Sequence, residues 1–424
     1  MPDRLAPAWL DHATVQRVVS LLGGAGDDIR FVGGCVRDAL LGEDVSDIDI
    51  GVPFPPDETV RRLEGAGFRA IPTGIDHGTV TALVDGETFE VTSLRQDVET
   101  DGRRAVVAYT SDWQDDALRR DFTINAMSLR PDGRVFDYFE GRTDLASRRT
   151  RFVGDPTERI IEDGLRILRF YRFAARFGLA HSDPVSRAAC ASNATLIRDL
   201  SRERIGQEFL KILVAPDAAT VLRAMAADGV LHHVVEDTAW DLDRFERMIA
   251  AEAALSMTAD PLRRLSALVA DPSRTETVSK ALRLSGKQAD HVLSVVQVAP
   301  DAAAEFSDPA EQDADAKIWR AAFYRHGAQI WRDAALLAQA ALESADNERL
   351  ARLNQAAVDW ERPTLPVRGA DLVARGLSGP AIGKGLTFVE RWWIANDFQP
   401  NREQALDKLE EAVALVRAMT AGPQ

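Results

Sequence analysis

Two aspartates, Asp47 and Asp49, stand one residue apart in the run VSDIDIGV. The β-branched residues around them predict a strand over residues 47–52, in which alternate side chains share a face, so both carboxylates point the same way. Two adjacent like charges repel, and a divalent cation relieves that repulsion. Mg²⁺ prefers one or two carboxylates together with water and substrate phosphates. An isolated pair is more typical of a solvated strand end or a turn, so the neighbouring residues decide the interpretation.

The residues just upstream favour a phosphate site. Gly33 and Gly34 permit a close approach of the backbone to a ligand, and residues 36–41 predict a short helix that Gly42 closes. Free N–H groups at the start of such a helix bind anions. Arg37 stands in the first turn, where a guanidinium gains little from the helix dipole but gains from a phosphate.

A third carboxylate follows in the run TFEVTSL. Glu90 alternates with Phe89 and Val91 and therefore faces away from them. Glu90 is therefore a candidate to join Asp47 and Asp49. The alternative is a glutamate at an edge strand that faces solvent. Together the three residues are the predicted metal-binding set, with Mg²⁺ as the predicted cofactor, and the resemblance described next implies that they are catalytic through a two-metal mechanism.

The spacing of the glycine pair, the Arg-Asp pair and the two aspartates resembles the nucleotidyltransferase superfamily. Four further runs follow in order: ALRRDFTINAM, VFDYFEGRTDL, DPTERIIEDGLRILRFYRFAARFG and SRERIGQEFLKIL. In this order they are similar to motifs of the class II CCA-adding enzymes and bacterial poly(A) polymerases. The resemblance covers about residues 31–213. It implies a head, neck, body and tail, with the nucleotide bound between head and neck.

The resemblance also implies the roles of individual residues. Glu90 completes the metal site, and Asp163 and Arg166 read the base. Asn125 is a candidate for contacting the ribose or for fixing its loop. The other residues expected to bind the nucleotide are Gly33, Gly34, Arg37, Arg120, Arg169 and Arg172.

Asp163 and Arg166 suit the recognition of cytosine and adenine on chemical grounds. Both bases carry an exocyclic amine donor beside a ring-nitrogen acceptor, whereas uracil and guanine carry a carbonyl beside an N–H. A carboxylate accepts from the amine, and a guanidinium donates to the ring nitrogen. We expect one helix to carry Asp163, Arg166, Arg169 and Arg172 along one flank. The alternative is a solvated surface with an ion pair between Asp163 and Arg166.

The predicted activity is the template-independent addition of C, C and A to the 3′ end of tRNA from CTP and ATP, with release of pyrophosphate. A loop over residues 97–113 looks like the flexible loop of enzymes that add all three nucleotides. The alternatives are a poly(A) polymerase, a CC- or A-adding specialist, and a catalytically silent RNA-binding protein.

Several motif residues leave two interpretations open. The basic run Arg148, Arg149 and Arg151 is either a contact with tRNA phosphate or a solvated face. The DYFEGRTDL run is either part of the site or a plain turn with Gly141 at positive φ. The ERIGQE run is more typical of an ion network that stiffens the neck than of a catalytic group.

Composition limits the class of protein. The chain has 424 residues, of which 28% are charged, and a formal net charge of −15. This composition is that of a folded globular protein and not of a wholly basic nucleic-acid binder. Cys35 and Cys190 exclude a disulfide framework or a cysteine-rich zinc site. Without a signal peptide or an apolar span in the sequence, we expect a cytoplasmic protein with no membrane contact. The oligomeric state stays open.

The chain divides by pattern into a β-rich part and a helical part. Short β-branched runs alternate with Gly, Pro and Asp turns up to about residue 144, and apolar residues at helical spacing follow from about residue 157. The predicted fold class is α+β, an α/β head followed by an all-α remainder. The predicted domains are the head 1–145, the neck 146–213, the body 214–330 and the tail 331–424.

Overall fold

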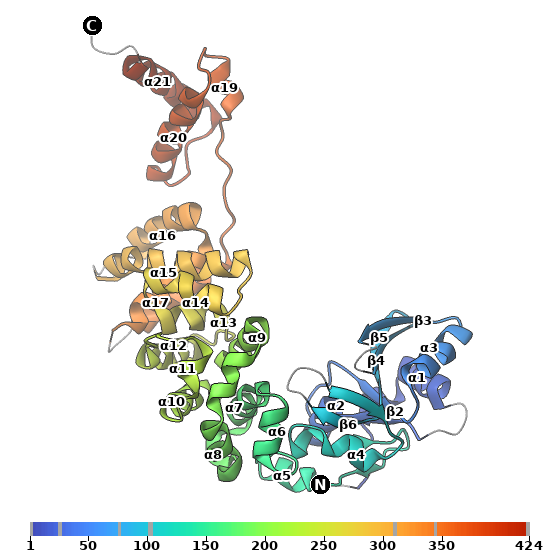
Figure 1. Ribbon diagram of the computed structural model, residues 1–424. Helices are drawn as coiled ribbons and strands as arrows, with labels where there is room; N and C mark the ends of the chain where they lie inside the picture. Colours follow the sequence, from blue (N-terminus) through green and yellow to red (C-terminus); the bar gives the residue numbers. More distant parts are fainter. Residues whose placement is uncertain are drawn as a thin grey trace. The chain divides into compact units, whose positions relative to one another are not determined.

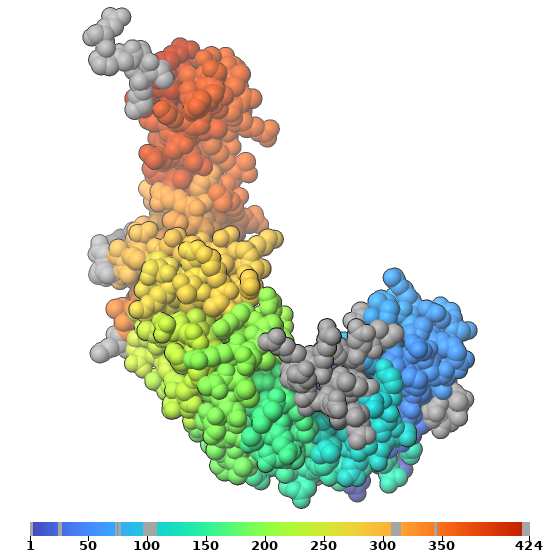
Figure 2. Space-filling view, viewed as in Figure 1, coloured from blue at the N-terminus to red at the C-terminus, as the bar shows by residue number. Residues whose placement is uncertain are grey.

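The structure is a computed structural model that describes residues 3–23, 28–74, 78–100, 105–307, 312–342 and 346–420. The chain forms two compact units (Figure 1). Unit 1 comprises Met1–Thr238 with Ala281–Arg283, and unit 2 comprises Ala239–Lys280 with Leu284–Gln424. Figure 2 shows the packed side chains, with the residues outside the described ranges in grey. The predicted four-part division stays a prediction, while the α+β class is confirmed.

A seven-stranded sheet forms the centre of the head. Its strand order is β3-β4-β5-β2-β1-β8-β9, and β2 and β5 run parallel while the other neighbours run antiparallel. A separate hairpin pairs β6 with β7. The strands are β1 Arg30–Val32, β2 Asp49–Val52, β3 Arg69–Gly74, β4 Thr79–Val84, β5 Glu87–Ser93, β6 Arg95–Thr100, β7 Ala105–Tyr109, β8 Ser128–Leu129 and β9 Val135–Phe136.

Alternation of apolar and polar residues places these strands. In β4 the side chains of Val80, Ala82 and Val84 are buried, and the residues between them are partly exposed, as expected for a sheet with one covered face. Helices α1 and α3 pack together, and α3 lies against β3, β4 and β5. The short helices of the head are η1 Ala8–Asp11, α1 Ala13–Gly23, α2 Gly34–Leu41, α3 Pro56–Gly65, α4 Trp113–Leu118, η3 Thr123–Asn125 and α5 Gly141–Ala146.

The helical remainder of unit 1 packs around α7. Its aromatic residues Phe170 and Phe173 are buried and contact Phe122 and Phe152, so one apolar cluster spans the head and the helices that follow it. These helices are α6 Pro156–Glu162, α7 Leu165–Phe177, η4 Leu179–His181, α8 Pro184–Ser192, η5 Ala194–Asp199, α9 Arg202–Leu213, α10 Ala218–Ala227 and α11 Val230–Val234.

Unit 2 is helical throughout its described residues. One core is built around Trp319, Phe323 and Trp331, and a second joins α19, α20 and α21. No helix in the described ranges is long and apolar enough to cross a lipid bilayer. The helices are α12 Leu242–Ala254, α13 Pro261–Val269, α14 Pro272–Ala281, α15 Gly286–Ser307, α16 Gln312–His326, α17 Ala328–Ala340, α18 Asn347–Val358, α19 Gly369–Val373, α20 Pro380–Ala395 and α21 Arg402–Thr420.

Candidate active site

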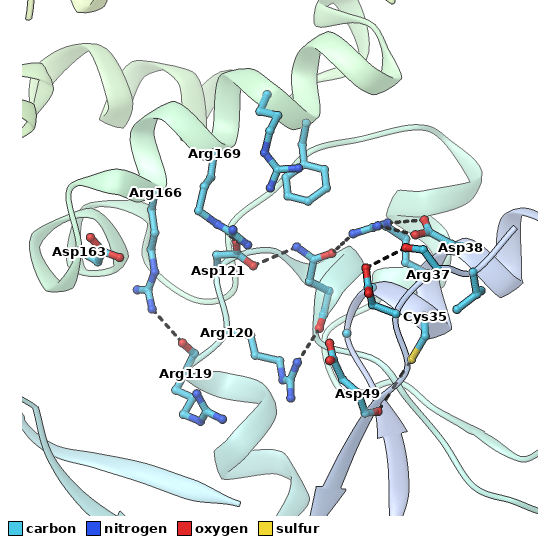
Figure 3. A pocket seen from close by; sticks show the side chains of 18 residues that line it. Cys35, Arg37, Asp38, Asp49, Arg119, Arg120, Asp121, Asp163, Arg166 and Arg169 are labelled. Carbon is cyan, nitrogen blue, oxygen red and sulfur yellow. Dashed lines mark hydrogen bonds and ion pairs between the residues drawn. The ribbon is translucent and has the colours of Figure 1, made fainter. Parts of the chain in front are cut away.

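The predicted site residues of the head, of α7 and of the turn before α7 meet in one cavity of unit 1, with a volume of about 660 Å³ (Figure 3). This volume is typical of a site for a nucleotide-sized ligand. Every predicted site residue lines the cavity except Glu90. The lining residues are Gly33, Gly34, Cys35, Arg37, Asp38, Val45, Ser46, Asp47, Asp49, Arg119, Arg120, Asp121, Asn125, Asp163, Arg166, Arg169, Arg172 and Phe173.

The glycine pair forms the turn from β1 into α2. Gly33 has φ of 74°, and the helix begins at Gly34, two residues before the predicted start at residue 36. A Cβ atom at Gly33 would lie 3.1 Å from Nη1 of Arg120 and 4.0 Å from Oδ2 of Asp49. Glycine is therefore required here both for the backbone conformation and for the close approach of the two charged groups.

The acidic residues gather at the start of β2. The strand begins at Asp49 and not at Asp47, because pairing with β5 begins at Asp49. Asp47 lies just before the strand, is exposed, and accepts a hydrogen bond of 2.8 Å from the Ser46 hydroxyl. Glu90 of β5 pairs with Asp49 across the parallel strands. Directly paired residues put their side chains on one face, so Glu90 lies beside Asp49 although it does not line the cavity.

Asp49 is half-buried, and the pKa of its carboxyl is raised. Burial and the charge of Glu90 raise the pKa of Asp49 to about 6, with a smaller contribution from Asp47, while Arg120 acts in the opposite direction. No side chain in the described ranges donates a hydrogen bond to this carboxylate. A partly desolvated, unpaired carboxylate among like charges is the environment in which a bound cation restores the ionised form.

A divalent cation fits these carboxylates. Within the described ranges, no three His, Cys, Asp or Glu side chains stand close enough to form a complete metal cluster. Mg²⁺ does not need one, since it takes one or two carboxylates and fills its other positions with water and substrate phosphates. Asp47 and Asp49, which face the same cavity, provide such a pair.

A chain of hydrogen bonds joins α2, the RRDFTINAM run and α7. Nη1 of Arg37 donates to Oδ1 of Asn125 over 2.7 Å, Nδ2 of Asn125 donates to Oδ1 of Asp121 over 3.0 Å, and Nε of Arg169 donates to Oδ2 of Asp121 over 2.7 Å (Figure 3). Burial acts to raise the pKa of Asp121, but Arg169 and Asn125 outweigh it and hold the pKa below its ordinary value. Asp121 is therefore an anion that positions two predicted nucleotide contacts.

Sequence reasoning did not assign a role to Asp121. Asp121 stands directly before the apolar residue Phe122. A charged residue beside a core residue is buried only when it has a partner, and this position was the available signal in the sequence. Arg120 is held by another buried acid, since its Nη2 lies 3.0 Å from Oδ2 of Asp116. The same carboxylate pairs with Arg119 at 2.6 Å. The RRD run is thus built into the cavity wall and is not a surface charge cluster.

The predicted continuous helix is wrong at Asp163. Helix α6 ends at Glu162, Asp163 has extended backbone angles, and α7 begins at Leu165. A Cβ atom at Gly164 would lie 3.1 Å from the carbonyl oxygen of Leu196, so the break accommodates the close approach of another segment. Gly164 is the N-cap of α7, and the Asp163 side chain just before it accepts from the Leu165 N–H at 3.1 Å.

Asp163 and Arg166 both face the cavity, but they do not pair with each other. Oδ2 of Asp163 lies 2.7 Å from Nη2 of Arg204, while Nη1 of Arg166 lies 2.5 Å from Oε2 of Glu162. Nη2 of Arg166 also donates to the carbonyl oxygen of Arg119 over 2.9 Å. The alternative of a simple Asp163–Arg166 surface ion pair is therefore wrong. Each group is held by a third residue.

The ERIGQE run supports the cavity from α9. Nε of Arg172 lies 2.6 Å from Oε2 of Glu208, and Lys211 pairs with the same carboxylate at 3.1 Å. Because Arg204 holds Asp163, both ends of the run hold a residue that faces the cavity. The interpretation of this run as an ion network agrees with these contacts.

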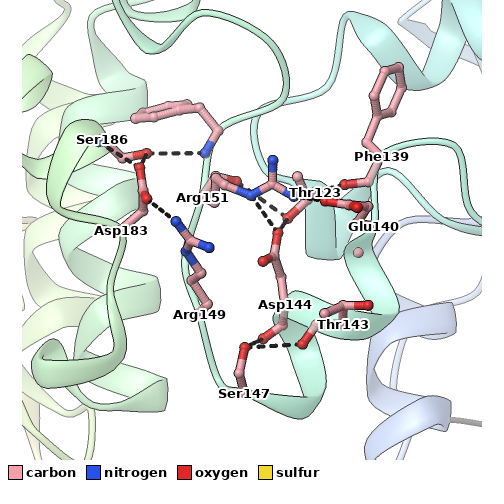
Figure 4. A network of polar contacts seen from close by, with 12 residues as sticks. Thr123, Phe139, Glu140, Thr143, Asp144, Ser147, Arg149, Arg151, Asp183 and Ser186 are labelled. Atoms are coloured by element: carbon pink, nitrogen blue, oxygen red, sulfur yellow. Dashed lines mark hydrogen bonds and ion pairs between the residues drawn. The ribbon is translucent and has the colours of Figure 1, made fainter.

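The DYFEGRTDL run takes part in a network of polar contacts (Figure 4). The Thr123 hydroxyl donates to Oδ2 of Asp144 over 2.7 Å, and Arg151 pairs with the same oxygen at 2.8 Å. Glu140, not Gly141, has positive φ, at 62°, so the predicted turn is wrong. A Cβ atom at Gly141 would lie 2.3 Å from the carbonyl oxygen of Thr123. The glycine is needed for close packing.

The basic run after this network is largely ion-paired. Arg149 pairs with Asp183, and Arg151 pairs with Asp144 and Glu140 (Figure 4). Arg148 is exposed. Two of the three arginines therefore stabilise the fold locally, which weakens the prediction that the run as a whole contacts tRNA phosphate.

Comparisons with known proteins agree with this architecture. Residues 29–151 match the family model described as the Poly A polymerase head domain, and residues 182–241 match a probable RNA and SrmB-binding site of polymerase A. The CCA tRNA nucleotidyltransferase 1, mitochondrial, of Danio rerio is 32% identical over 402 residues, covering 91% of this chain and 88% of the relative. The CCA-adding enzyme of Lacticaseibacillus paracasei is 30% identical over 386 residues, covering 89% and 91%.

Solved structures show the same fold. The Bacillus stearothermophilus CCA-adding enzyme in complex with CTP superimposes with a TM-score of 0.73 at 24% identity, covering 96% of this chain and 98% of the other. The Thermotoga maritima CCA-adding enzyme complexed with tRNA superimposes with a TM-score of 0.65 at 20% identity, covering 98% and 97%. At these identities the likeness establishes the fold alone.

Proposed function

We propose, from the premise that this chain belongs to the family of CCA-adding enzymes, or CCA tRNA nucleotidyltransferases, that it adds C, C and A in turn to the 3′ end of tRNA. CTP and ATP are the substrates, and each addition releases pyrophosphate. One observation carries the proposal: a single cavity is lined by the half-buried Asp49, by a set of arginines, and by Asp163 and Arg166. Phosphoryl transfer and base selection need these two kinds of group side by side.

Nucleotidyltransferases use divalent metal ions in general, and we propose Mg²⁺ held by Asp47 and Asp49, with Glu90 beside them. When bound, the metal supplies a lower pKa for the attacking 3′-hydroxyl and charge compensation at the leaving pyrophosphate. Asp49 has to give up its proton before it binds the metal, and this step is favoured as the pH rises above about 6.

The arginines receive the triphosphate. Arg37 is buried and oriented by Asp38 and Asn125, at 2.8 and 2.7 Å, and Arg120 is oriented by Asp116. Guanidinium groups that are already held in place lose little freedom when they bind phosphate, so the triphosphate meets a prepared site. Gly33 and Gly34 leave room for the phosphates at the start of α2.

Base selection rests on Asp163 and Arg166. The Asp163 carboxylate accepts from the amine of cytosine or adenine, and the Arg166 guanidinium donates to the ring nitrogen. The contacts with Arg204 and Glu162 hold the two groups apart, and a carboxylate with further lone pairs and a guanidinium with five N–H donors can still bond to a base edge. Uracil and guanine present a carbonyl to the carboxylate and an N–H to the guanidinium, so both contacts become repulsive or unpaired.

The alternatives are not favoured. Relatives that match along nearly their whole length are named as CCA-adding enzymes or CCA tRNA nucleotidyltransferases, which argues against a poly(A) polymerase, a CC- or A-adding specialist and a silent RNA-binding protein. The loop over residues 97–113 contains residues 101–104, which lie outside the described ranges, so its role in full CCA addition stays a prediction. A cytoplasmic location also stays a prediction, in keeping with the two free cysteines.

One assay tests the activity. Radiolabelled tRNA that lacks its CCA end is incubated with Mg²⁺ and with CTP, ATP, UTP or GTP alone, and with CTP and ATP together, and product lengths are read on a gel. We expect two additions with CTP alone and three with the pair. Long A tails with ATP alone would identify a poly(A) polymerase. No extension by the wild-type protein under any condition would contradict the proposal.

A further inference from the structure

Three cavity arginines converge on the ring of one aromatic residue, Phe173. The Cζ atoms of Arg172, Arg37 and Arg169 lie over the ring at 4.4, 5.2 and 6.0 Å from its centroid. Arg37 comes from α2, whereas the other two come from α7, the helix of Phe173 itself. Phe173 is 2% exposed, yet it lines the cavity. It is thus the place where the aromatic core meets the charged site.

Three guanidinium groups around one cavity repel each other before any nucleotide binds. Each has an acidic neighbour, respectively Glu208, Asp38 and Asp121 for Arg172, Arg37 and Arg169. Each acidic partner holds its own arginine, but it does not hold the three arginines together. The negative face of an aromatic ring attracts cations within about 6 Å, most strongly where water is excluded. Phe173 lies within that distance of all three groups, and the Arg37 side chain is the most buried of them.

The ring itself is fixed. Phe122 contacts it edge-on at a centroid distance of 5.3 Å, and Phe177 stacks on it at 6.2 Å with an interplanar angle of 9°. A ring that cannot rotate presents a constant surface to the arginines. An aliphatic side chain of similar size would fill the same space but would offer no π face.

We propose that Phe173 is a positioning residue for nucleotide binding, whose ring holds Arg37, Arg169 and Arg172 in the arrangement that receives the triphosphate. The inference rests on the proposed function, since it names how the same cavity is prepared for its substrate. Phe173 acts through the arginines and not on the reacting atoms. Its removal should therefore weaken binding of every nucleoside triphosphate alike and leave the choice of base unchanged.

The test compares Phe173→Leu with Phe170→Leu. Phe170 lies in the same helix, is fully buried, and does not line the cavity, so it controls for the loss of a core ring. Calorimetric titration with CTP and with ATP in Mg²⁺, and KM from primer extension, are measured for both variants. We expect Phe173→Leu to raise Kd and KM for both nucleotides by about 5- to 30-fold, the range of one or two desolvated cation–π contacts. Phe170→Leu should stay within about twofold of wild type.

A second series separates ring electronics from packing. Fluorinated phenylalanines at position 173, with one, two or three fluorines, keep the shape of the ring but weaken its negative face. Kd for CTP should rise stepwise with fluorine number, even if Phe173→Leu proves poorly folded. A flat series in a protein that still extends tRNA would overturn the positioning role alone. A wild-type protein that fails to extend tRNA would instead contradict the proposed function.

Discussion

Replacing Asp49 with asparagine should make the metal-free protein more stable and the enzyme inactive. Burial and the neighbouring Glu90 raise the pKa of Asp49 to about 6 from its ordinary value of 3.8. Above pH 6 the folded protein therefore holds an ionised carboxylate at an energetic cost that the unfolded chain does not bear. The difference between the two pKa values corresponds to about 3 kcal/mol at neutral pH. Since the carboxyl is only partly buried, we expect Asp49→Asn to recover about 1–2 kcal/mol.

The pH dependence gives the sign of the effect. As the pH falls from about 6 towards 4, the Asp49 carboxyl of the wild type is protonated in the folded protein, and the cost of its charge is progressively lost. The advantage of Asp49→Asn should therefore be full at pH 7.5 and close to zero near pH 4. Urea denaturation in EDTA at both pH values measures the free energy of unfolding. Asp47→Asn is the matched control, because Asp47 is exposed and its substitution should change stability by less than about 0.5 kcal/mol.

Both substitutions should lower the catalytic activity, although Asp49→Asn should stabilise the metal-free protein. Both Asp49→Asn and Asp47→Asn should lower the rate of nucleotide addition by about 10³-fold or more in saturating Mg²⁺, because a metal ligand is lost. A variant within tenfold of wild type would refute the metal assignment. An Asp49→Asn protein that is less stable than wild type in EDTA at pH 7.5 would refute the account of the strained carboxylate.

Two further predictions concern base choice and close packing. Asp163→Ala should lower kcat/KM for CTP and ATP by about 5- to 150-fold and bring these values closer to those for UTP and GTP. Arg172→Ala should lower the rate of addition of all four nucleotides alike in single-turnover assays. An Asp163→Ala enzyme that keeps the wild-type preference for C and A would contradict the role of Asp163 in base selection. Gly141→Ala should destabilise the protein by about 1–3 kcal/mol in chemical denaturation, because its Cβ atom would lie 2.3 Å from the Thr123 carbonyl oxygen. Gly65→Ala, with no atom within 4 Å, should be neutral or stabilising by up to about 1 kcal/mol, and equal losses in the two variants would contradict the packing argument.

The local part of the site was predictable from sequence. Asp47 and Asp49 share a cavity because alternation along an extended segment is a local rule, and it holds even though the strand begins only at Asp49. Glu90 was placed beside them by the resemblance to a family, and the strand pairing agrees with that placement. Gly33 could be identified because a glycine pair before a helix commonly marks a close approach to the backbone.

Contacts between distant segments were not predictable. The helix break after Asp163 depends on the carbonyl oxygen of Leu196, which no periodicity reveals. The partner of Asp163 is likewise the distant Arg204, whereas Arg166 pairs with Glu162 at the local i,i+4 spacing. Local propensity indicates that residues 156–177 favour a helix, but tertiary packing decides where that helix is interrupted.

The parallel pairing of Asp49 with Glu90 makes the acidic group of the site depend on the tertiary fold and not on any single local segment. The strands β2 and β5 are far apart in sequence, and parallel pairing of distant strands forms late and slowly. A slip of one residue carries Glu90 to the opposite face of the sheet. A newly made or partly unfolded chain thus lacks the assembled acidic group even when its helices are formed.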